Sequence, residues 1–242
     1  MNLDFLVPAG TAAVAHSPME ASAADEGAHF EVRSGWNVAA SYGSDPKAER
    51  RTAERVAGWA DVSQLGKLEL QGPAEQLAEL AGAPLELGTA TRSQDAWWCP
   101  LTLTRALVIG EPAAGAELRE RLTAALGDPG AAATNVVDVT TTFAALTIVG
   151  PEATEVFARF SALDLRPSST PVGALRPGSI ARQPAVLVRE APQRYLFLFG
   201  WATAEYVWSV VADAGHHLGA RPIGADALAG LAEAEIAESS RA

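Results

Sequence analysis

The chain has 242 residues and a mass of 25.2 kDa, which suits one large domain or two small lobes. Apolar residues make up 48% of the sequence, so a sizeable core can form. The formal net charge of −11 argues against a nucleic-acid binder and against adsorption to anionic lipid. The single cysteine has no partner for an intrachain disulfide and cannot build a cysteine-based metal cage.

Location and metal content are predicted from the same composition. The four histidines are scattered along the sequence, so we expect no metal site. No apolar run approaches the ~20 residues that a membrane span needs. The first residues, Met1–Asp4, include an acid where a signal peptide has a positive charge. We therefore expect a cytoplasmic protein that contacts neither membrane nor nucleic acid.

The N-terminal part predicts an arm followed by a hairpin and a helix. Residues 1–28 are rich in small residues and have no sustained hydrophobic period, which predicts a loosely ordered arm. Alternating residues at 30–33 and a strand-like run at 36–42 flank a Ser-Gly turn, which predicts a β-hairpin. Asp45 and Pro46 then predict a helix start, because aspartate caps helices and proline fits the first helical position.

An internal repeat is the most informative feature of the sequence. An Asp-Val-Ser or Asp-Val-Thr triplet, an apolar strand and a Gly-Pro pair occur twice in the same order, with Asp61 and Asp138 separated by 77 residues. Because the two aspartates occupy equivalent positions, we expect each to cap a turn through its side-chain oxygen. The predicted strands are 65–70 and 145–149.

Each copy continues with a helix, a pair of strands and a second helix. The predicted segments are 75–80, 97–101, 105–109 and 116–126 in the first copy, and 152–160, 185–189, 195–199 and 203–214 in the second. Gly215 is predicted to end the last helix. The fold class is therefore α+β, with two pseudo-repeated strand–helix–strand–strand–helix units, about 59–127 and 136–218. These units form a two-lobed domain over 29–230. Residues 231–242 form a C-terminal tail whose Ala- and Glu-rich sequence predicts a fraying helix.

The order of these motifs resembles the folate-binding fold of the glycine-cleavage T-protein (aminomethyltransferase) family. Residues 59–68 are similar to the entry segment of that family, and residues 219–228 resemble the region after its second helix. The resemblance covers roughly residues 29–230. The family core continues into a C-terminal extension that does not follow in this sequence.

The resemblance implies three candidate site residues. The stretch 91–95 matches a glycine-rich loop of the family and keeps its final acid, so Asp95 is a candidate catalytic acid that would hold a cationic amine. The stretch 189–195 matches a second family signature, Arg-Thr-Gly-Tyr-Thr-Gly-Glu, of which Arg189 is kept. Arg189 and Tyr195 are therefore candidate folate contacts. The alternatives are a solvated loop acid for Asp95 and a strand-end surface arginine for Arg189.

The tryptophans suggest an interface. Trp97 and Trp98 are adjacent on a predicted strand, so their side chains point to opposite faces and one can be exposed. An exposed tryptophan is a natural interface anchor, and Trp97, Trp98 and Trp201 are the candidates. The alternative is that the core takes these rings. Cys99 is expected to be a small buried hydrophobe.

Within this fold family the sequence is similar to the γ-subunit family of heterotetrameric sarcosine oxidases. That resemblance implies a subunit without its own active site or cofactor, bound to larger α and β subunits and a small δ subunit. Tetrahydrofolate, FAD, FMN and NAD would be held by these partners, which oxidise sarcosine to glycine and transfer the one-carbon unit to tetrahydrofolate. The alternatives are a free-standing folate-dependent aminomethyltransferase or demethylase, and a duplicated binding module without enzymatic function.

Overall fold

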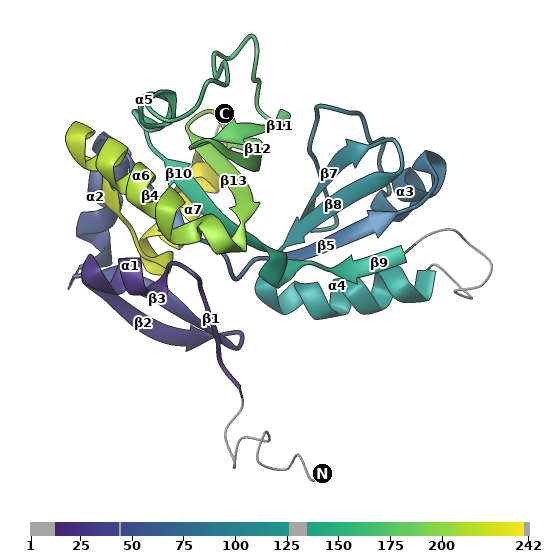
Figure 1. The fold of residues 1–242 in the computed structure, drawn as a ribbon, viewed down its shortest axis with the longest axis horizontal. Helices are drawn as coiled ribbons and strands as arrows, with labels where there is room; N and C mark the ends of the chain where they lie inside the picture. Colours follow the sequence, from purple (N-terminus) through teal and green to yellow (C-terminus); the bar gives the residue numbers. More distant parts are fainter. Residues whose placement is uncertain (1–12, 44, 126–134, 240–242) are drawn as a thin grey trace.

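The computed structural model describes residues 13–43, 45–125 and 135–239 and contains two β-sheet lobes side by side (Figure 1). The first lobe is a five-stranded antiparallel sheet with helices α3 (Ala74–Ala81) and α4 (Pro112–Ala125). Its strands, in spatial order, are β6 (Thr91–Ser93), β7 (Ala96–Thr102), β8 (Arg105–Gly110), β5 (Gly66–Gln71) and β9 (Asn135–Asp138).

The second lobe is a six-stranded sheet built on the same plan. Its strands, in spatial order, are β11 (Leu175–Ile180), β12 (Gln183–Ala191), β13 (Arg194–Gly200), β10 (Phe143–Val149), β4 (Gly58–Asp61) and β14 (Arg221–Pro222). Its helices are α2 (Pro46–Arg55), α5 (Ala153–Ala158), α6 (Ala204–Leu218) and α7 (Ala225–Ser239), with 3₁₀ turns at Thr140–Thr142 and Trp201–Thr203. The predicted pair of α+β units is therefore confirmed. Each unit has two more strands than predicted, β4 and β6 in the first and β9 and β11 in the second.

The N-terminal segment differs from the predicted loose arm. In its described part, β1 (Ala15–His16) pairs with β3 (Trp36–Tyr42), and α1 (Glu20–Asp25) leads into β2 (Ala28–Arg33). Met19 is fully buried in the core of the second lobe. The boundary at residue 28 is wrong because this buried side chain and the parallel strand pair fix residues that have no hydrophobic period of their own. Residues 1–12 lie outside the described residues.

The predicted hairpin and helix start are confirmed. β2 and β3 form an antiparallel pair, and Ser34 and Gly35 between them both have positive φ angles, 49° and 78°. The Asp45 carboxylate accepts a hydrogen bond of 2.9 Å from the Lys47 N–H at the start of α2. This bond satisfies one of the backbone donors that a helix N-terminus leaves without an intrahelical partner.

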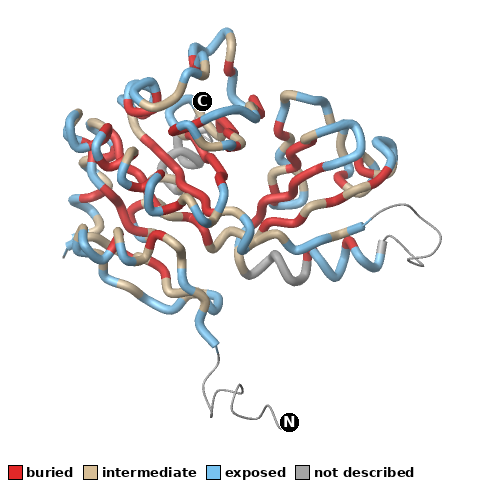
Figure 2. The backbone as a smooth tube through the Cα atoms, in the orientation of Figure 1, coloured by how far each residue is buried: buried red, intermediate tan, exposed pale blue. Residues whose placement is uncertain are grey.

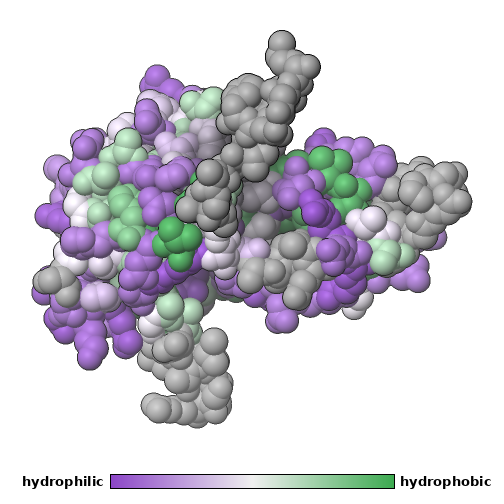
Figure 3. Space-filling view, turned by 90° about the horizontal axis from the view of Figure 1, so that it is seen from below, coloured by the Kyte–Doolittle hydropathy of each residue, from purple (hydrophilic) through white to green (hydrophobic). Residues whose placement is uncertain are grey.

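The two sheets turn their inner faces toward each other and share a core. Outer clusters pack the first sheet against α3 and α4, and the second against α5 and α6. Between the lobes, Cys99, Leu107 and Ile109 of the first sheet pack with Leu196 and Leu198 of the second. Buried residues run along the facing strands of both lobes (Figure 2). Seen from below, hydrophilic residues predominate on the visible surface of both lobes, and the most strongly hydrophobic residues appear toward the middle of the view (Figure 3).

The two copies exchange their first strands. β4 leads into the first copy but pairs with β10 of the second, and β9 leads into the second copy but pairs with β5 of the first. The turn after each exchanged strand is held as predicted: Asp61 accepts a bond of 2.9 Å from the Ser63 N–H, and Asp138 accepts one of 2.9 Å from the Thr140 N–H. Both aspartates therefore have the turn-capping role that their equivalent positions indicated.

The hydroxyls of these turns bind reciprocally to the other lobe. The Ala145 N–H donates to Ser63 Oγ at 3.1 Å, and the Lys67 N–H donates to Thr140 Oγ1 at 3.0 Å. Ala145 and Lys67 are 78 residues apart, close to the 77-residue offset of the aspartates, so the two bonds are related by the internal repeat. The repeat therefore fixes how the lobes join as well as how each lobe folds.

Lys67 lies at this crossing with a fully buried side chain. Its ammonium donates to the carbonyl oxygens of Ser63 at 2.8 Å, Leu65 at 3.0 Å and Thr140 at 3.4 Å. Burial lowers the pKa of Lys67 to about 8, although the negative charges of Asp61 and Asp138 favour its protonated form. Burial also raises the pKa of Asp61, which accepts a hydrogen bond from the Ser17 hydroxyl of the N-terminal segment.

Two predicted boundaries in the C-terminal part are wrong. α6 continues through Gly215 and ends at Gly219, which has a left-handed φ of 87°. Gly215 is an interior helix residue because the Trp59 ring packs on it: a Cβ there would lie 2.6 Å from Cζ3 of Trp59. The helix predicted from residue 231 is present over 231–239, but it begins earlier, because these residues are the C-terminal part of α7, which starts at Ala225. Among the described residues, every helix is too short or too polar to span a bilayer.

The contact between Gly215 and Trp59 predicts the effect of adding a methyl group there. Gly215→Ala should lower the free energy of unfolding by about 1–3 kcal/mol, because overpacking forces the ring or the helix to move. Gly230→Ala in α7 is the matched control, since its Cβ would meet only side-chain atoms of Arg50, at 3.4 Å or more. Urea denaturation should show the Gly230 variant unchanged or slightly more stable; equal losses in both variants would contradict the packing argument.

The lowered pKa of Lys67 predicts a pH-dependent stability. Between pH 8 and the unfolded-state pKa of 10.5, the unfolded chain binds this proton more tightly than the folded chain does, so the Lys67 contribution to stability rises with pH. The difference in unfolding free energy between wild type and Lys67→Met should therefore shift by about 1–2 kcal/mol in favour of wild type between pH 8 and 9.5. Taking the difference between the two proteins cancels the titration of groups that do not interact with Lys67. A pH-independent difference in urea midpoints would show that Lys67 titrates normally.

Candidate functional site

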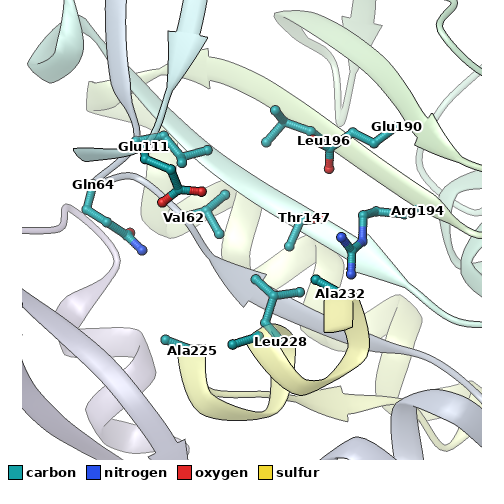
Figure 4. A pocket seen from close by; sticks show the side chains of 12 residues that line it. Val62, Gln64, Glu111, Thr147, Glu190, Arg194, Leu196, Ala225, Leu228 and Ala232 are labelled. Atoms are coloured by element: carbon teal, nitrogen blue, oxygen red, sulfur yellow. The ribbon is translucent and has the colours of Figure 1, made fainter. Parts of the chain in front are cut away.

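A cavity of about 270 Å³ lies where the two lobes meet α7 (Figure 4). The turn after β4, the end of β8, the inner face of the second sheet and one side of α7 all contribute to it. Its described lining residues are Val62, Gln64, Leu65, Glu111, Thr147, Glu190, Arg194, Leu196, Ala225, Leu228, Ala229 and Ala232. The cavity therefore combines an apolar wall with a small number of polar groups, as ligand sites do.

Successive side chains along a strand point to opposite faces of the sheet, and this alternation decides which of them face the cavity. On β12 and β13, Glu190, Arg194 and Leu196 line it, whereas Arg189 and Tyr195 lie on the opposite face of the sheet, where Tyr195 is part of the outer core. Glu190 accepts a hydrogen bond of 2.8 Å from the Trp97 indole N–H of the first lobe. This bond joins the two lobes directly at the wall of the cavity.

Thr147 contributes a buried hydroxyl to the cavity wall. It lies on β10, its residue is 3% exposed, and its hydroxyl has no hydrogen-bond partner. A buried hydroxyl without a partner costs about 1–3 kcal/mol. Because Thr147 keeps an unsatisfied hydroxyl at the wall of a cavity, this hydroxyl is a candidate ligand contact.

Asp95 is not among the lining residues of this cavity. It sits in the turn between β6 and β7, is exposed and has a φ of 60°. The acids that do line the cavity are Glu111 and Glu190, and the resemblance to the T-protein family singles out neither of them.

Arg189 and Tyr195 are engaged in structural contacts. The buried Arg189 guanidinium donates to the carbonyl oxygens of Thr170 at 2.6 Å and Pro192 at 2.7 Å and lies over the Tyr195 ring at 5.3 Å. Tyr195 is fully buried, and its hydroxyl shares a hydrogen bond of 2.8 Å with Thr154. The structure therefore does not bring Asp95, Arg189 and Tyr195 together in one site. Arg189 is also not the surface arginine of the alternative interpretation, because it is 6% exposed.

The three candidate interface tryptophans have different environments. Trp98 is fully buried in the outer core of the first lobe and donates to the Ser93 carbonyl at 3.2 Å, so it is not available to a partner. Trp97 is partly buried between the lobes, with the Arg92 guanidinium 5.6 Å from its ring centre. Trp201 is partly exposed and lies 6.3 Å from Trp36. Of the three, Trp201 remains the best candidate for a partner contact.

The described lining of the cavity does not include the folate contacts that the resemblance implied. The two residues that the family signature assigns to the folate, Arg189 and Tyr195, face the other side of the sheet. No step of a folate reaction can therefore be assigned to these residues.

The chemistry that the lining residues offer is hydrogen bonding and charge. The described lining residues include two carboxylates, a guanidinium, an amide and a hydroxyl, and no cysteine, histidine or serine. Burial raises the pKa of the Cys99 thiol, which keeps it protonated and unreactive. No group of His, Cys, Asp or Glu side chains in the described part of the chain is arranged to hold a metal ion.

Comparisons with known proteins define the fold. No family model and no curated protein matches the sequence. Among solved structures, the glycine cleavage system aminomethyltransferase T from Bartonella henselae matches 89% of this chain with a TM-score of 0.73 and 14% identity. A chain of the heterotetrameric sarcosine oxidase from Corynebacterium sp. U-96, solved with pyrrole 2-carboxylate, matches 82% of this chain with a TM-score of 0.63 and 22% identity.

The fold is therefore that of the T-protein aminomethyltransferases, as the repeated motifs indicated. The chain spans about three fifths of the aminomethyltransferase, since the match covers 61% of that protein. It spans nearly all of the sarcosine oxidase chain, of which 93% is covered. Both neighbours thus share the fold of this protein. The match covers nearly all of the sarcosine oxidase chain and about three fifths of the aminomethyltransferase.

The unsatisfied hydroxyl at the cavity predicts opposite effects for two threonine substitutions. Thr147→Val should leave the stability unchanged or raise it by about 1 kcal/mol, because it removes a buried hydroxyl that has no partner. Thr154→Val should lower the stability by about 1 kcal/mol, because it leaves the buried Tyr195 hydroxyl without its bond. Thermal unfolding of both variants measures this. A loss in the Thr147 variant as large as that in the Thr154 variant would mean that the Thr147 hydroxyl does have a partner.

Proposed function

We propose that this protein is a γ-type accessory subunit of a heterotetrameric sarcosine oxidase. The observation that carries the proposal is the match to that assembly: this protein aligns with 93% of one of its chains at 22% identity, against 14% identity to the aminomethyltransferase. In the proposed complex the α, β and δ subunits are the partners. The larger partners hold tetrahydrofolate, FAD, FMN and NAD and oxidise sarcosine to glycine.

The environment of the candidate site residues supports an accessory role. Arg189 and Tyr195 stabilise the second lobe through backbone carbonyls and a buried hydroxyl bond, which leaves neither of them for a substrate.

A second candidate function is a free-standing folate-dependent aminomethyltransferase. The observation that favours it is the cavity itself, which the unsatisfied Thr147 hydroxyl and the Glu111 carboxylate line. Under this alternative the isolated chain binds tetrahydrofolate by partial entry into the cavity. Calorimetric titration of the isolated chain with tetrahydrofolate separates the two functions, because an accessory subunit gives no heat of binding.

Purification of the tagged chain from its native host tests the accessory role. Larger chains and a flavin absorption spectrum should accompany it, and the complex should oxidise sarcosine. In that complex Asp95→Asn should retain the activity within about twofold, whereas a true acid–base residue contributes about 10²–10⁴-fold. A colourless protein that purifies alone would contradict the proposal. A 10²-fold loss in an intact Asp95→Asn complex would place the chemistry in this chain.

A further inference from the structure

Helix α2 carries an exposed row of positive charge on a strongly acidic protein. Lys47, Arg51 and Arg55 are all exposed and follow each other at intervals of four residues, so they lie on one face of the helix. The helical rise places them ~6 Å apart, in a row of ~12 Å. The chain as a whole has a net charge of −11. α2 lies at the outer side of the second lobe, away from the first lobe (Figure 1).

This basic row has little internal compensation. Lys47 and Arg55 form no ion pair in the part of the chain that the structure describes, and Arg51 lies 3.4 Å from Asp45 with a side chain that is 67% exposed. The two glutamates of α2 bind other groups than the basic row. Glu54 pairs with Arg50 at 2.7 Å. Glu49 is buried and accepts from two backbone N–H groups, those of Tyr42 and Gly224, both at 2.7 Å.

A second cavity of about 290 Å³ borders the row. Ala48 and Thr52 line it, and they directly follow two of the basic residues on α2. Arg221 and Tyr42 line its other sides, with Glu26 and the engaged Glu49. The Tyr42 hydroxyl is buried and has no hydrogen-bond partner. Burial raises the pKa of this phenol, so it remains a proton donor at neutral pH.

We infer that the basic row of α2 and the adjoining cavity form a docking site for an acidic segment of another protein. Carboxylates spaced ~6 Å apart, as at every fourth position of a helix, match the spacing of Lys47, Arg51 and Arg55. One side chain of the segment that ends in an acceptor oxygen enters the cavity and accepts a hydrogen bond from Tyr42. Charge complementarity with the basic row orients the acidic segment on α2, and the side chain that fills the cavity anchors it.

An acidic protein segment suits this surface better than a nucleic acid or a lipid bilayer. The row offers three charges over ~12 Å, and the remainder of a chain with net charge −11 repels an extended polyanion. A short acidic segment contacts only the row and the cavity. The inference goes beyond the proposed function, because it concerns the surface that is used and does not require the partner to be a sarcosine oxidase.

A fluorescent helical peptide with glutamates at every fourth position is the probe for this site. Its anisotropy should rise in a saturable way with the full-length protein at low salt, and added salt should weaken the binding. The triple variant Lys47→Gln, Arg51→Gln, Arg55→Gln should bind at least tenfold more weakly. The control variant Arg119→Gln, Arg159→Gln, Arg182→Gln changes the net charge equally at scattered exposed positions and should bind like wild type. Tyr42→Phe should weaken binding severalfold with an unchanged circular dichroism spectrum.

Three results would overturn the docking site. They are no saturable binding of the peptide by wild type, equal losses of binding in both triple variants, and tighter binding of a single-stranded oligonucleotide or of phosphatidylserine vesicles than of the peptide.

A failure of the proposed function can be distinguished from a failure of the docking site. If the flavin complex assembles equally with both triple variants while the peptide does not bind, the docking site is wrong and the accessory role stands. If wild type binds the peptide but purifies without a flavin complex, the accessory role is wrong and the docking site stands.

Discussion

The exchange of first strands between the two copies is the constraint on which the rest of the structure depends. β4 and β9 each complete the sheet of the other lobe, so neither copy can close its sheet alone. The turns that follow are closed by Asp61 and Asp138, and their hydroxyls bind backbone N–H groups across the junction. The Lys67 ammonium binds carbonyl oxygens from both turns where they meet. Unpaired backbone N–H groups at the buried junction would lower the stability of the fold, and the reciprocal hydrogen bonds avoid this loss.

The same exchange creates the candidate site. Because each sheet contains a strand of the other copy, the inner faces of the two sheets are held against each other and share an apolar core. The cavity forms where this shared core ends and α7 crosses the junction (Figure 4). The bond from Trp97 to Glu190 spans the lobes at the wall of that cavity. A change in the angle between the lobes would therefore alter the cavity, so its shape depends on the same contacts that hold the fold together.

The fold does not by itself decide between an enzyme and an accessory subunit, because one fold serves different functions. The neighbours that share it are an aminomethyltransferase and a chain of a heterotetrameric sarcosine oxidase. The distinction lies in single side chains. Where the T-protein signature would supply folate contacts, this chain has Arg189 bound to backbone carbonyls and Tyr195 packed in the outer core. The polar groups that do reach the cavity are their neighbours on the strands, Glu190 and Arg194. A shift of one residue along a strand moves a side chain to the other face of the sheet.

The sequence by itself determined the local features and the duplication. Periodicity, the Asp45 cap and the equivalent aspartates are properties of short segments, and short segments need only local contacts to form. The offset between the copies then predicted two similar units. Only the tertiary structure decided which strand belongs to which lobe, because strand exchange leaves the order of elements along the chain unchanged. It also decided that Gly215 continues a helix against Trp59, that Met19 anchors the N-terminal segment, and that Glu111, Thr147 and Glu190 line one cavity. These are contacts between residues far apart in sequence, which no local pattern encodes.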